Sequence, residues 1–156
     1  MFSLSGYKGK KVLVTGHTGF KGGWLCKILT MAGANVIGYS LAPEELSLYQ
    51  LIGLDKNVCT KIGDIRNFNG LLKVFHIEEP EIVFHLAAQP LVRESYKEPV
   101  YTYETNVLGT VYVCECVRKS KTVKSFLNVT TDKVYKNNEW EWGYRENDPL
   151  DGFDPY

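Results

Sequence analysis

Short apolar runs alternate with segments of helical periodicity along most of this chain. The first run, residues 11–15, is rich in β-branched residues and stops at Gly16, as a buried strand does. Apolar residues then recur at helical spacing from Phe20 to Ala32, and Gly33 ends the predicted helix. The opening segment therefore predicts a strand, a glycine turn and a helix.

The same alternation continues toward the carboxyl end. Further strands are predicted at residues 35–39, 58–62, 82–86 and 125–129, further helices at 68–75 and 103–117, and a loop at 43–55. The longer helix should bury one apolar stripe. Its members are Tyr103, Val107, Thr110 or Val111, Cys114 and Val117. Because parallel neighbours need a crossover and helices cover both faces of such a sheet, the order predicts a doubly wound α/β fold with five parallel strands.

Size and composition are those of an ordinary soluble protein that recognises a small molecule. The 156 residues fit one domain and include 44% hydrophobic and 23% charged residues. Eighteen Lys and Arg balance 18 Asp and Glu without a block of like charge, so nothing draws the chain to nucleic acid or to an anionic membrane. No basic segment with an apolar run behind it opens the chain, and we expect a cytoplasmic location.

The four cysteines lack the paired spacing of a zinc site or a redox motif, which agrees with a reducing compartment. Cys114 and Cys116 suggest a metal pair, but residues two apart on a helix point to different faces. We therefore interpret both thiols as core residues and expect no metal.

The segment from residue 132 to 156 has no regular period. It contains Tyr135, Trp140, Trp142 and Tyr144 among polar residues and two prolines. Disordered segments are poor in aromatic residues, so we expect this tail to pack over another part of the protein.

Three glycines follow the first predicted strand at regular spacing. Gly16, Gly19 and Gly22 lie within the segment 16–22, GHTGFKG. The first permits a tight turn, and the others let the backbone approach a pyrophosphate, whose charge the N–H groups of a helix N-terminus stabilise. We interpret the segment as a dinucleotide-binding turn, with a purely structural turn as the alternative. The G-x-x-G-x-x-G spacing points to short-chain dehydrogenase/reductases.

The second and third strands end where a dinucleotide would place its adenosine. An acid at the end of the second strand usually grips the ribose of NAD, but Tyr39 and Ser40 stand there instead. No arginine cluster is available for a 2′-phosphate, so NAD is preferred over NADP without being deduced. Asp64, after the third strand, is a candidate acceptor for the adenine amino group or, equally, a cap of the next helix.

A hydroxyl, a carboxylate and an amine follow one another after the fifth strand, at Thr131, Asp132 and Lys133. Ligands of open α/β sheets bind beyond the carboxyl ends of strands. Such a set could bind a substrate oxygen, protonate a leaving group and remove a carbon-bound proton, provided that the lysine is partly neutral. The alternative is a solvated pair of Asp132 and Lys133 that opens a loop.

Taken together, these segments resemble the extended short-chain dehydrogenase/reductase family and, within it, the CDP-glucose 4,6-dehydratases. The resemblance runs from residue 6 to 156 and rests on residues 15–24, 85–93, 105–110 and 130–135, and most specifically on 139–146 with 154–156. It implies an NAD-binding Rossmann-type domain over residues 1–156 that is truncated after the fifth strand. The positions that match cofactor contacts are Gly16, His17, Thr18, Gly19, Phe20, Lys21, Gly22, Tyr39, Ser40, Asp64, Ile65, Leu86, Ala87, Ala88, Gln89, Thr130 and Tyr156.

The resemblance also implies a reaction. NAD would oxidise the fourth carbon of CDP-glucose, water would leave across the fifth and sixth carbons, and the hydride would return to the sixth. The product, CDP-4-keto-6-deoxyglucose, is a precursor of deoxysugars in surface polysaccharides such as the lipopolysaccharide O-antigen. Matching positions make Tyr156 the base for the 4-hydroxyl, Thr131 its companion, Asp132 the acid and Lys133 the group at the fifth carbon. Gln89, Arg93, Asn106 and Thr131 match substrate positions.

Two features separate this sequence from its apparent relatives. The dTDP-glucose enzymes carry glutamate where Lys133 stands, so the Asp-Lys pair favours the CDP branch, although UDP-N-acetylglucosamine 4,6-dehydratases have a similar pair. Family members also place a lysine four residues beyond the tyrosine at position 156, together with a dimer-forming helix and a region that grips the nucleotide base. None of these is present in the 156 residues.

Three functional hypotheses follow. The first is a nucleotide-sugar dehydratase that these residues represent in part, homodimeric as in the parent family and inactive as an isolated chain. The second is a dinucleotide-binding module without turnover, because Tyr156 lacks the lysine that would activate it. The third is an interaction protein on a Rossmann scaffold, since fold does not dictate chemistry. The nucleotide base and the role of Gln89 and Arg93 stay open at this stage.

Overall fold

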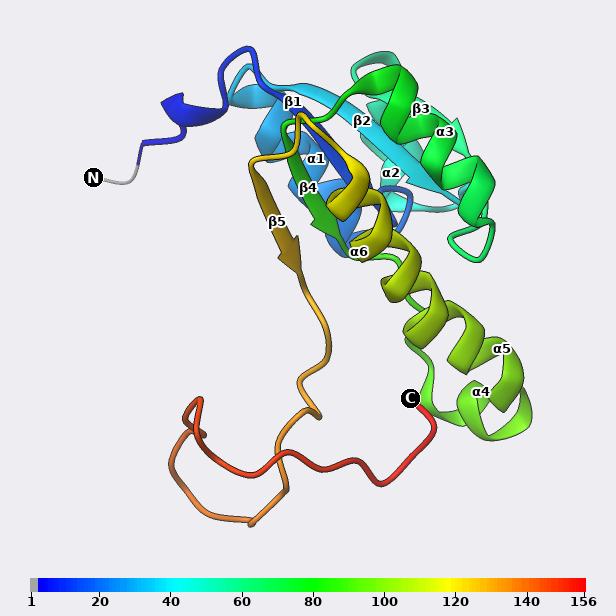
Figure 1. Cartoon of the computed structure of the whole chain (residues 1–156), viewed down its shortest axis with the longest axis vertical. Helices are drawn as coiled ribbons and strands as arrows, with labels where there is room; N and C mark the ends of the chain where they lie inside the picture. Colours follow the sequence, from blue (N-terminus) through cyan, green and yellow to red (C-terminus); the bar gives the residue numbers. More distant parts are fainter. Residues whose placement is uncertain (1–2) are drawn as a thin grey trace.

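A computed structural model describes residues 3–156 and has five parallel strands in one sheet (Figure 1). The strands are β1 (Lys11–Thr15), β2 (Asn35–Ser40), β3 (Cys59–Ile62), β4 (Ile82–His85) and β5 (Ser125–Asn128). Their order across the sheet is β3-β2-β1-β4-β5, and every neighbouring pair is parallel. The predicted doubly wound α/β sheet is confirmed.

Six α-helices connect the strands. They are α1 (Phe20–Met31), α2 (Leu48–Leu51), α3 (Phe68–Glu78), α4 (Val92–Lys97), α5 (Pro99–Tyr103) and α6 (Gly109–Lys119). Short 3-10 turns, η1 (Ser5–Tyr7) and η2 (Leu54–Lys56), and a π-helical segment, η3 (Glu104–Leu108), complete the elements. The expected loop at 43–55 is thus wrong in part, because it contains α2 and η2. Among the described helices, none has the length and apolar character that crossing a bilayer requires.

Each face of the sheet has its own hydrophobic core. Leu13 of β1 points to the face covered by α3 and α6, where it packs with Leu71 and Val113. Its neighbours Val12 and Val14 point to the opposite face, which α1 and α2 cover (Figure 1). Successive residues of a strand alternate between faces, so a run that is apolar throughout needs cover on both sides.

The continuous helix formed by α5, η3 and α6 buries a different stripe from the one predicted. Tyr103, Val107 and Val111 are about half exposed. The residues buried in their place are Thr102, Thr105, Gly109, Val113 and Cys116. The helix lies so close to the core that a Cβ at Gly109 would stand 2.8 Å from the Ile65 side chain, so small residues occupy this face. Of the two cysteines predicted to be core residues, Cys116 is buried, whereas Cys114 is exposed.

A chain of buried polar groups joins the ends of β1 and β4 to this helix. Thr15 Oγ1 accepts the N–H groups of Leu86 and Ala87, both at 3.2 Å, and lies 2.6 Å from Nδ1 of His85. On the other side of the ring, Nε2 of His85 lies 3.1 Å from Thr110 Oγ1, whose proton goes to a helix carbonyl. The one arrangement that supplies every bond with a donor is a neutral imidazole with its proton on Nε2. This network fixes the start of the loop at residues 86–90.

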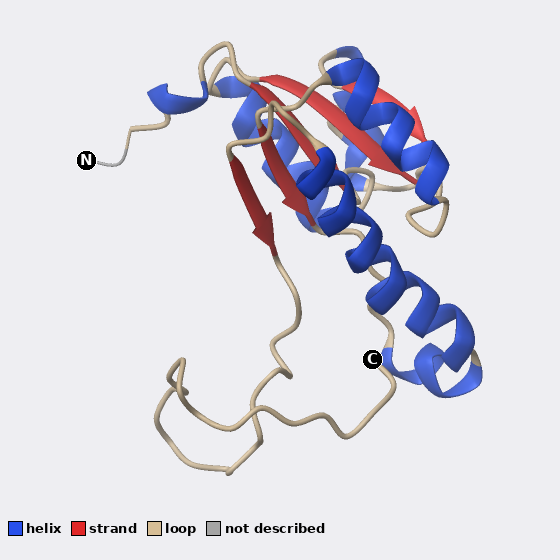
Figure 2. Cartoon of the chain, viewed as in Figure 1, coloured by secondary structure: helices blue, strands red, loops and turns tan. Residues whose placement is uncertain are grey.

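After β5 the chain leaves the sheet, and residues 129–156 form neither helix nor strand (Figure 2). The rings of Tyr135 and Tyr144 stack with centroids 5.3 Å apart, and Trp140 packs on Tyr144. Toward the rest of the protein, Tyr96 of α4 donates a hydrogen bond to the Phe153 carbonyl at 3.4 Å. The expectation that the tail packs rather than being disordered is met in part, because its aromatic rings pack on one another and one hydrogen bond joins its end to α4.

The central position of β1 gives a test of the fold. Leu13→Ala should lower the free energy of unfolding by about 3 kcal/mol, because the side chain is fully buried and its removal leaves a cavity. Leu127→Ala in β5 is the matched control, since its side chain is 48% exposed, and it should cost less than about 1 kcal/mol. Urea denaturation followed by circular dichroism measures both. Equal losses would contradict the two-sided core around β1.

The His85 network predicts a dependence of stability on pH. Burial lowers the pKa of His85 from 6.5 to about 4. Between these values the unfolded chain binds a proton at this residue and the folded chain does not, so stability is lost as pH falls from 6.5 toward 4. The contribution of His85 to this loss should be about 3 kcal/mol. In His85→Gln the fall in unfolding free energy between pH 7 and 4.5 should be smaller than in the unmodified chain. An equal fall in both would refute the lowered pKa of His85 as a cause of the pH dependence.

Candidate functional site

The turn between β1 and α1 is built from glycines that pack against backbone. Gly16 has a φ of +72°, a left-handed conformation, and a Cβ there would lie 2.8 Å from the Ala87 nitrogen. A Cβ at Gly22 would overlap the carbonyl oxygen of Gly16. Gly19 is different, because a Cβ there would meet only the Gly16 oxygen, at 3.4 Å. Close packing therefore explains Gly16 and Gly22, whereas the space in front of Gly19 is open.

The start of α1 is suited to an anion. Gly19 is the N-cap residue, so no side chain accepts a hydrogen bond from the first turn of the helix. The first N–H groups of a helix have no partner within it and carry the positive end of its dipole. The following residues, Phe20 and Lys21, are exposed. A turn that approaches closely and an uncapped helix together fit a diphosphate.

His17 and Thr18, both candidate cofactor residues, turn their side chains inward. The imidazole of His17 is buried and fills the space that Gly38 leaves, with Nε2 3.2 Å from Thr60 Oγ1. Burial lowers its pKa to about 4, so the ring is neutral near pH 7. Thr18 Oγ1 lies 2.7 Å from Ser40 Oγ. These side chains hold the turn against β2, which leaves the backbone of the turn to face a ligand.

At the ends of β2 and β3, the candidate side chains divide between the core and the surface. Tyr39 is buried, and its hydroxyl donates to the Asp64 carbonyl at 2.9 Å. Ile65 is buried as well. The Asp64 carboxylate pairs with Arg66 at 2.7 Å, and the hydrogen bond from that guanidinium lowers its pKa. Asn67, not Asp64, caps α3 by accepting the Gly70 N–H, so the capping alternative for Asp64 is wrong.

The loop at residues 86–90 is braced by Asn106 from the π-helical segment η3. Asn106 Oδ1 accepts the Gln89 N–H at 2.8 Å, and its amide donates to the Gln89 carbonyl at 3.1 Å. The Gln89 side chain is buried and bonds to Leu91 and to Thr102. Both amide side chains therefore stiffen the loop. Ala88 and Arg93 are exposed.

The candidate catalytic residues Lys133 and Tyr156 meet in the tail. Thr131 Oγ1 donates to Asp132 Oδ1 and accepts the Lys133 N–H, both at 3.2 Å. The ammonium of Lys133 pairs with Asp154 at 2.8 Å and lies 5.9 Å from the centroid of the Tyr156 ring. Lys133 thus pairs with Asp154 and not with Asp132, the partner in the solvated-pair alternative. The hydrogen bond to Asp154 raises the pKa of Lys133, so in this arrangement the amine is protonated rather than partly neutral.

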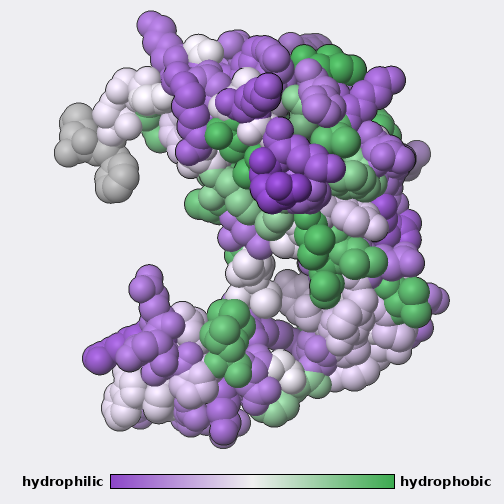
Figure 3. Space-filling view, viewed as in Figure 1, coloured by the Kyte–Doolittle hydropathy of each residue, from purple (hydrophilic) through white to green (hydrophobic). Residues whose placement is uncertain are grey.

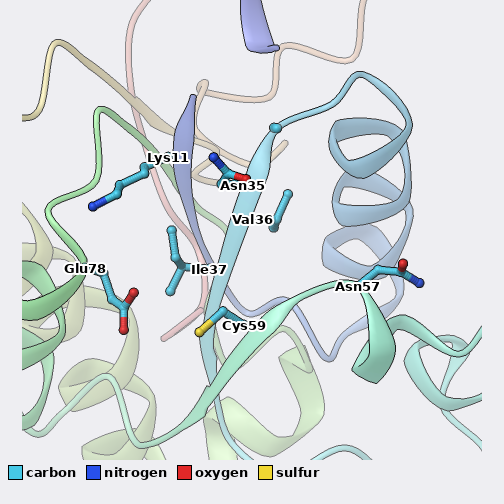
Figure 4. A pocket seen from close by; sticks show the side chains of 8 residues that line it. Lys11, Asn35, Val36, Ile37, Asn57, Cys59 and Glu78 are labelled. Atoms are coloured by element: carbon cyan, nitrogen blue, oxygen red, sulfur yellow. The ribbon is translucent and has the colours of Figure 1, made fainter. Parts of the chain in front are cut away.

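The structure keeps these two groups of candidates apart. Within residues 3–156, no hydrogen bond or ion pair joins residues 130–156 to residues 16–22. The space-filling view shows a notch between the body and the tail (Figure 3). A cavity of about 310 Å³ lies at the opposite, amino end of the strands, between Lys11, Asn35 and Glu78, and none of the candidate residues lines it (Figure 4). The described residues include no group of His, Cys, Asp or Glu placed to hold a metal ion.

Two charged residues that sequence reasoning missed now stand beside the candidates. Arg66 pairs with Asp64 and with Glu104 at 3.1 Å, and its guanidinium stacks 4.6 Å from the Tyr101 ring centroid. Asp154 contacts Lys133, 21 positions earlier. Arg66 adjoins the candidate Ile65, and Asp154 lies in the segment 154–156 on which the family resemblance rests, but the sequence assigned no role to either side chain.

Comparison with known proteins places the chain in a family. Residues 13–156 match the family model described as GDP-mannose 4,6 dehydratase. CDP-glucose 4,6-dehydratase of Salmonella typhimurium is 52% identical over 157 residues, which is 100% of this chain and 44% of that protein. CDP-paratose 2-epimerase of Salmonella typhi is 31% identical over 152 residues, covering 92% of this chain and 45% of the epimerase. The chain spans less than half the length of these relatives.

Solved structures give the same fold. A UDP-glucose 4-epimerase of Thermotoga maritima with UDP-glucose superposes with a TM-score of 0.82 at 29% identity, over 94% of this chain and 46% of the epimerase chain. A Thermus thermophilus UDP-glucose 4-epimerase in complex with NAD superposes with a TM-score of 0.80 at 28% identity, again over 94% and 46%. The fold is thus the Rossmann type, and the chain belongs to the GDP-mannose 4,6 dehydratase family.

Proposed function

We propose that this chain supplies the NAD-binding part and several catalytic groups of a dehydratase that converts CDP-D-glucose to CDP-4-keto-6-deoxy-D-glucose and water. The observation that carries the proposal is the 52% identity with a CDP-glucose 4,6-dehydratase, which extends over the whole chain. The glycine turn supports the cofactor, because its close backbone and uncapped helix fit a diphosphate. The T. thermophilus structure supports NAD in particular.

The cofactor would lie across the carboxyl ends of the strands. The backbone of residues 16–22 would hold the diphosphate, and the exposed Ala88 lies on the rigid loop beside it. Asp64 would offer a carboxylate oxygen to the adenine, with Arg66 keeping that carboxylate ionised. When bound, NAD would accept a hydride from the fourth carbon of the sugar and return it to the sixth.

The remaining chemistry is proton transfer by residues of the tail. Tyr156 would take the proton of the 4-hydroxyl, with Thr131 as its hydrogen-bonding companion. Asp132 would give a proton to the 6-hydroxyl, which departs as water, and Lys133 in its neutral form would take the proton from the fifth carbon. Lys133 and Tyr156 already lie side by side, which supports their joint role.

Location and biological role follow from the same family resemblance. We place the chain in the cytoplasm, which agrees with the exposed free thiols of Cys59 and Cys114. We also propose that the protein acts as a homodimer and that its product feeds the synthesis of deoxysugars for lipopolysaccharide O-antigen. The competing alternative is a related nucleotide-sugar enzyme acting on a dTDP or UDP sugar.

Replacement of Gly19 tests the cofactor site. Gly19→Leu should reduce NAD affinity at least about tenfold, because the side chain would project in front of the uncapped helix. The folded state should lose less than about 1 kcal/mol, since only one atom lies near that position. Gly6→Leu is the control, because nothing lies within 4 Å of its added Cβ. Calorimetric titration with NAD decides, and unchanged affinity in Gly19→Leu would remove the diphosphate from this turn.

An assay of the 156-residue polypeptide tests whether it binds NAD without catalysing the reaction. We expect micromolar binding of NAD without formation of ketosugar from CDP-glucose. Lys133 is held as an ammonium by Asp154, and within residues 3–156 no hydrogen bond joins residues 130–156 to the glycine turn. The absorbance of the ketosugar in base measures the product. Formation of product at an enzymatic rate would contradict this expectation, and failure to bind either NAD or NADP would favour an interaction protein.

A further inference from the structure

One carboxylate connects the two candidate catalytic residues of the tail. Asp154 Oδ2 accepts a hydrogen bond from the ammonium of Lys133 at 2.8 Å. The other oxygen, Oδ1, accepts the backbone N–H of Tyr156 at 3.1 Å. The Asp154 side chain is 13% exposed, whereas that of Lys133 is 47% exposed. Asp154 is therefore the shielded member of the pair and the fixed point of the contact.

The loop of residues 134–151 brings this carboxylate to Lys133. Tyr135 and Leu150 form an antiparallel bridge, and the Lys136 N–H donates to the Pro149 carbonyl at 2.8 Å. The Asp151 N–H donates to the Val134 carbonyl at 3.3 Å. The loop closes on itself at its base, so the residues that precede and follow it emerge side by side. The local pairing of the backbone thus explains how positions 133 and 154 meet.

We propose that Asp154 is a positioning residue that holds Lys133 as an ammonium beside the Tyr156 ring and fixes the Tyr156 backbone. The charged and titratable groups that face Lys133 are Asp154, Asp132 and Tyr156. The Asp132 carboxylate accepts the Thr131 hydroxyl, which leaves Asp154 as the direct partner of the ammonium. The contact with the Tyr156 N–H is an Asx turn of a kind common in loops. The contact with Lys133 joins positions 21 residues apart and is the one that carries the proposal.

The pair has a consequence for the proposed dehydratase, and in this respect the inference rests on the proposed function. An ammonium has no lone pair and cannot take a proton from carbon. With the pair closed, Lys133 acts only as a hydrogen-bond donor and a positive charge. Lys133 can serve as a base only after the pair opens and the amine loses its proton to solvent. Asp154 therefore sets which of the two roles Lys133 has.

The pKa of the Lys133 amine, measured by NMR in the chain labelled with ¹³Cε-lysine, tests the proposal. Lys133→Arg assigns the signal. Asp154→Asn should lower the pKa by about half a unit or more, since the opposite charge is removed from a partly exposed site. It should also shift the Tyr156 amide resonance. Asp151→Asn is the matched control, because its carboxylate contacts only the Gly152 N–H, and it should change neither signal.

A conservative variant separates a charge effect from a loss of structure. Asp154→Glu keeps the carboxylate and should restore most of the Lys133 pKa, while a general collapse of the loop would leave it low. An unchanged pKa in Asp154→Asn, or an equal fall in Asp151→Asn, would overturn the proposal. NAD titration of the same samples keeps the two hypotheses distinct. If the unmodified chain does not bind NAD, the proposed function is refuted. The pKa of Lys133 in the variants would still show whether Asp154 positions it.

Discussion

Backbone-to-backbone contact around Gly16 is the constraint on which the rest of the structure depends. The turn after β1 lies against Ala87 in the loop after β4 on one side and against Gly22 of α1 on the other. A methyl group at either glycine position would separate these elements. Because β1 is the central strand, its turn is the one place where the N-terminus of α1 and the loop after β4 can both face the same ligand.

Polar groups that are buried around this turn reinforce the same geometry. Thr15, His85 and Thr110 exchange hydrogen bonds in one direction, and Asn106 continues the network to the loop after β4. A fully satisfied network in a low-dielectric interior is rigid, because each bond orients the next. The π-helical segment carries Asn106, in keeping with the frequent use of such segments at functional sites. Rigidity at the strand ends thus comes from buried polar contacts as well as from hydrophobic packing.

Most of the sheet and the glycine turn were predictable from the sequence, because the spacing of apolar residues and of glycines depends directly on local structure. The buried stripe of the long helix was not predictable. The helix lies close to Ile65, so Gly109 and other small residues face the core in place of larger apolar residues. The ion-pair partners of Asp64 and Lys133 could not be predicted from the sequence either. Arg66 lies near Asp64 in sequence, but its side-chain direction is a matter of rotamers, and Asp154 meets Lys133 only through a loop closure.

The two parts of the candidate site are stabilised by different physics, and this argues for different roles. The glycine turn is held by backbone packing in the core, where no titration near neutral pH can disturb it, since His17 and His85 both have a pKa of about 4. In the tail, Lys133 is held by one partly exposed ion pair, and such a contact opens at small cost. A dinucleotide needs a fixed cradle, whereas residues that exchange protons with a substrate must be able to change partners. The rigid turn and the looser contact between Lys133 and Asp154 match these two requirements.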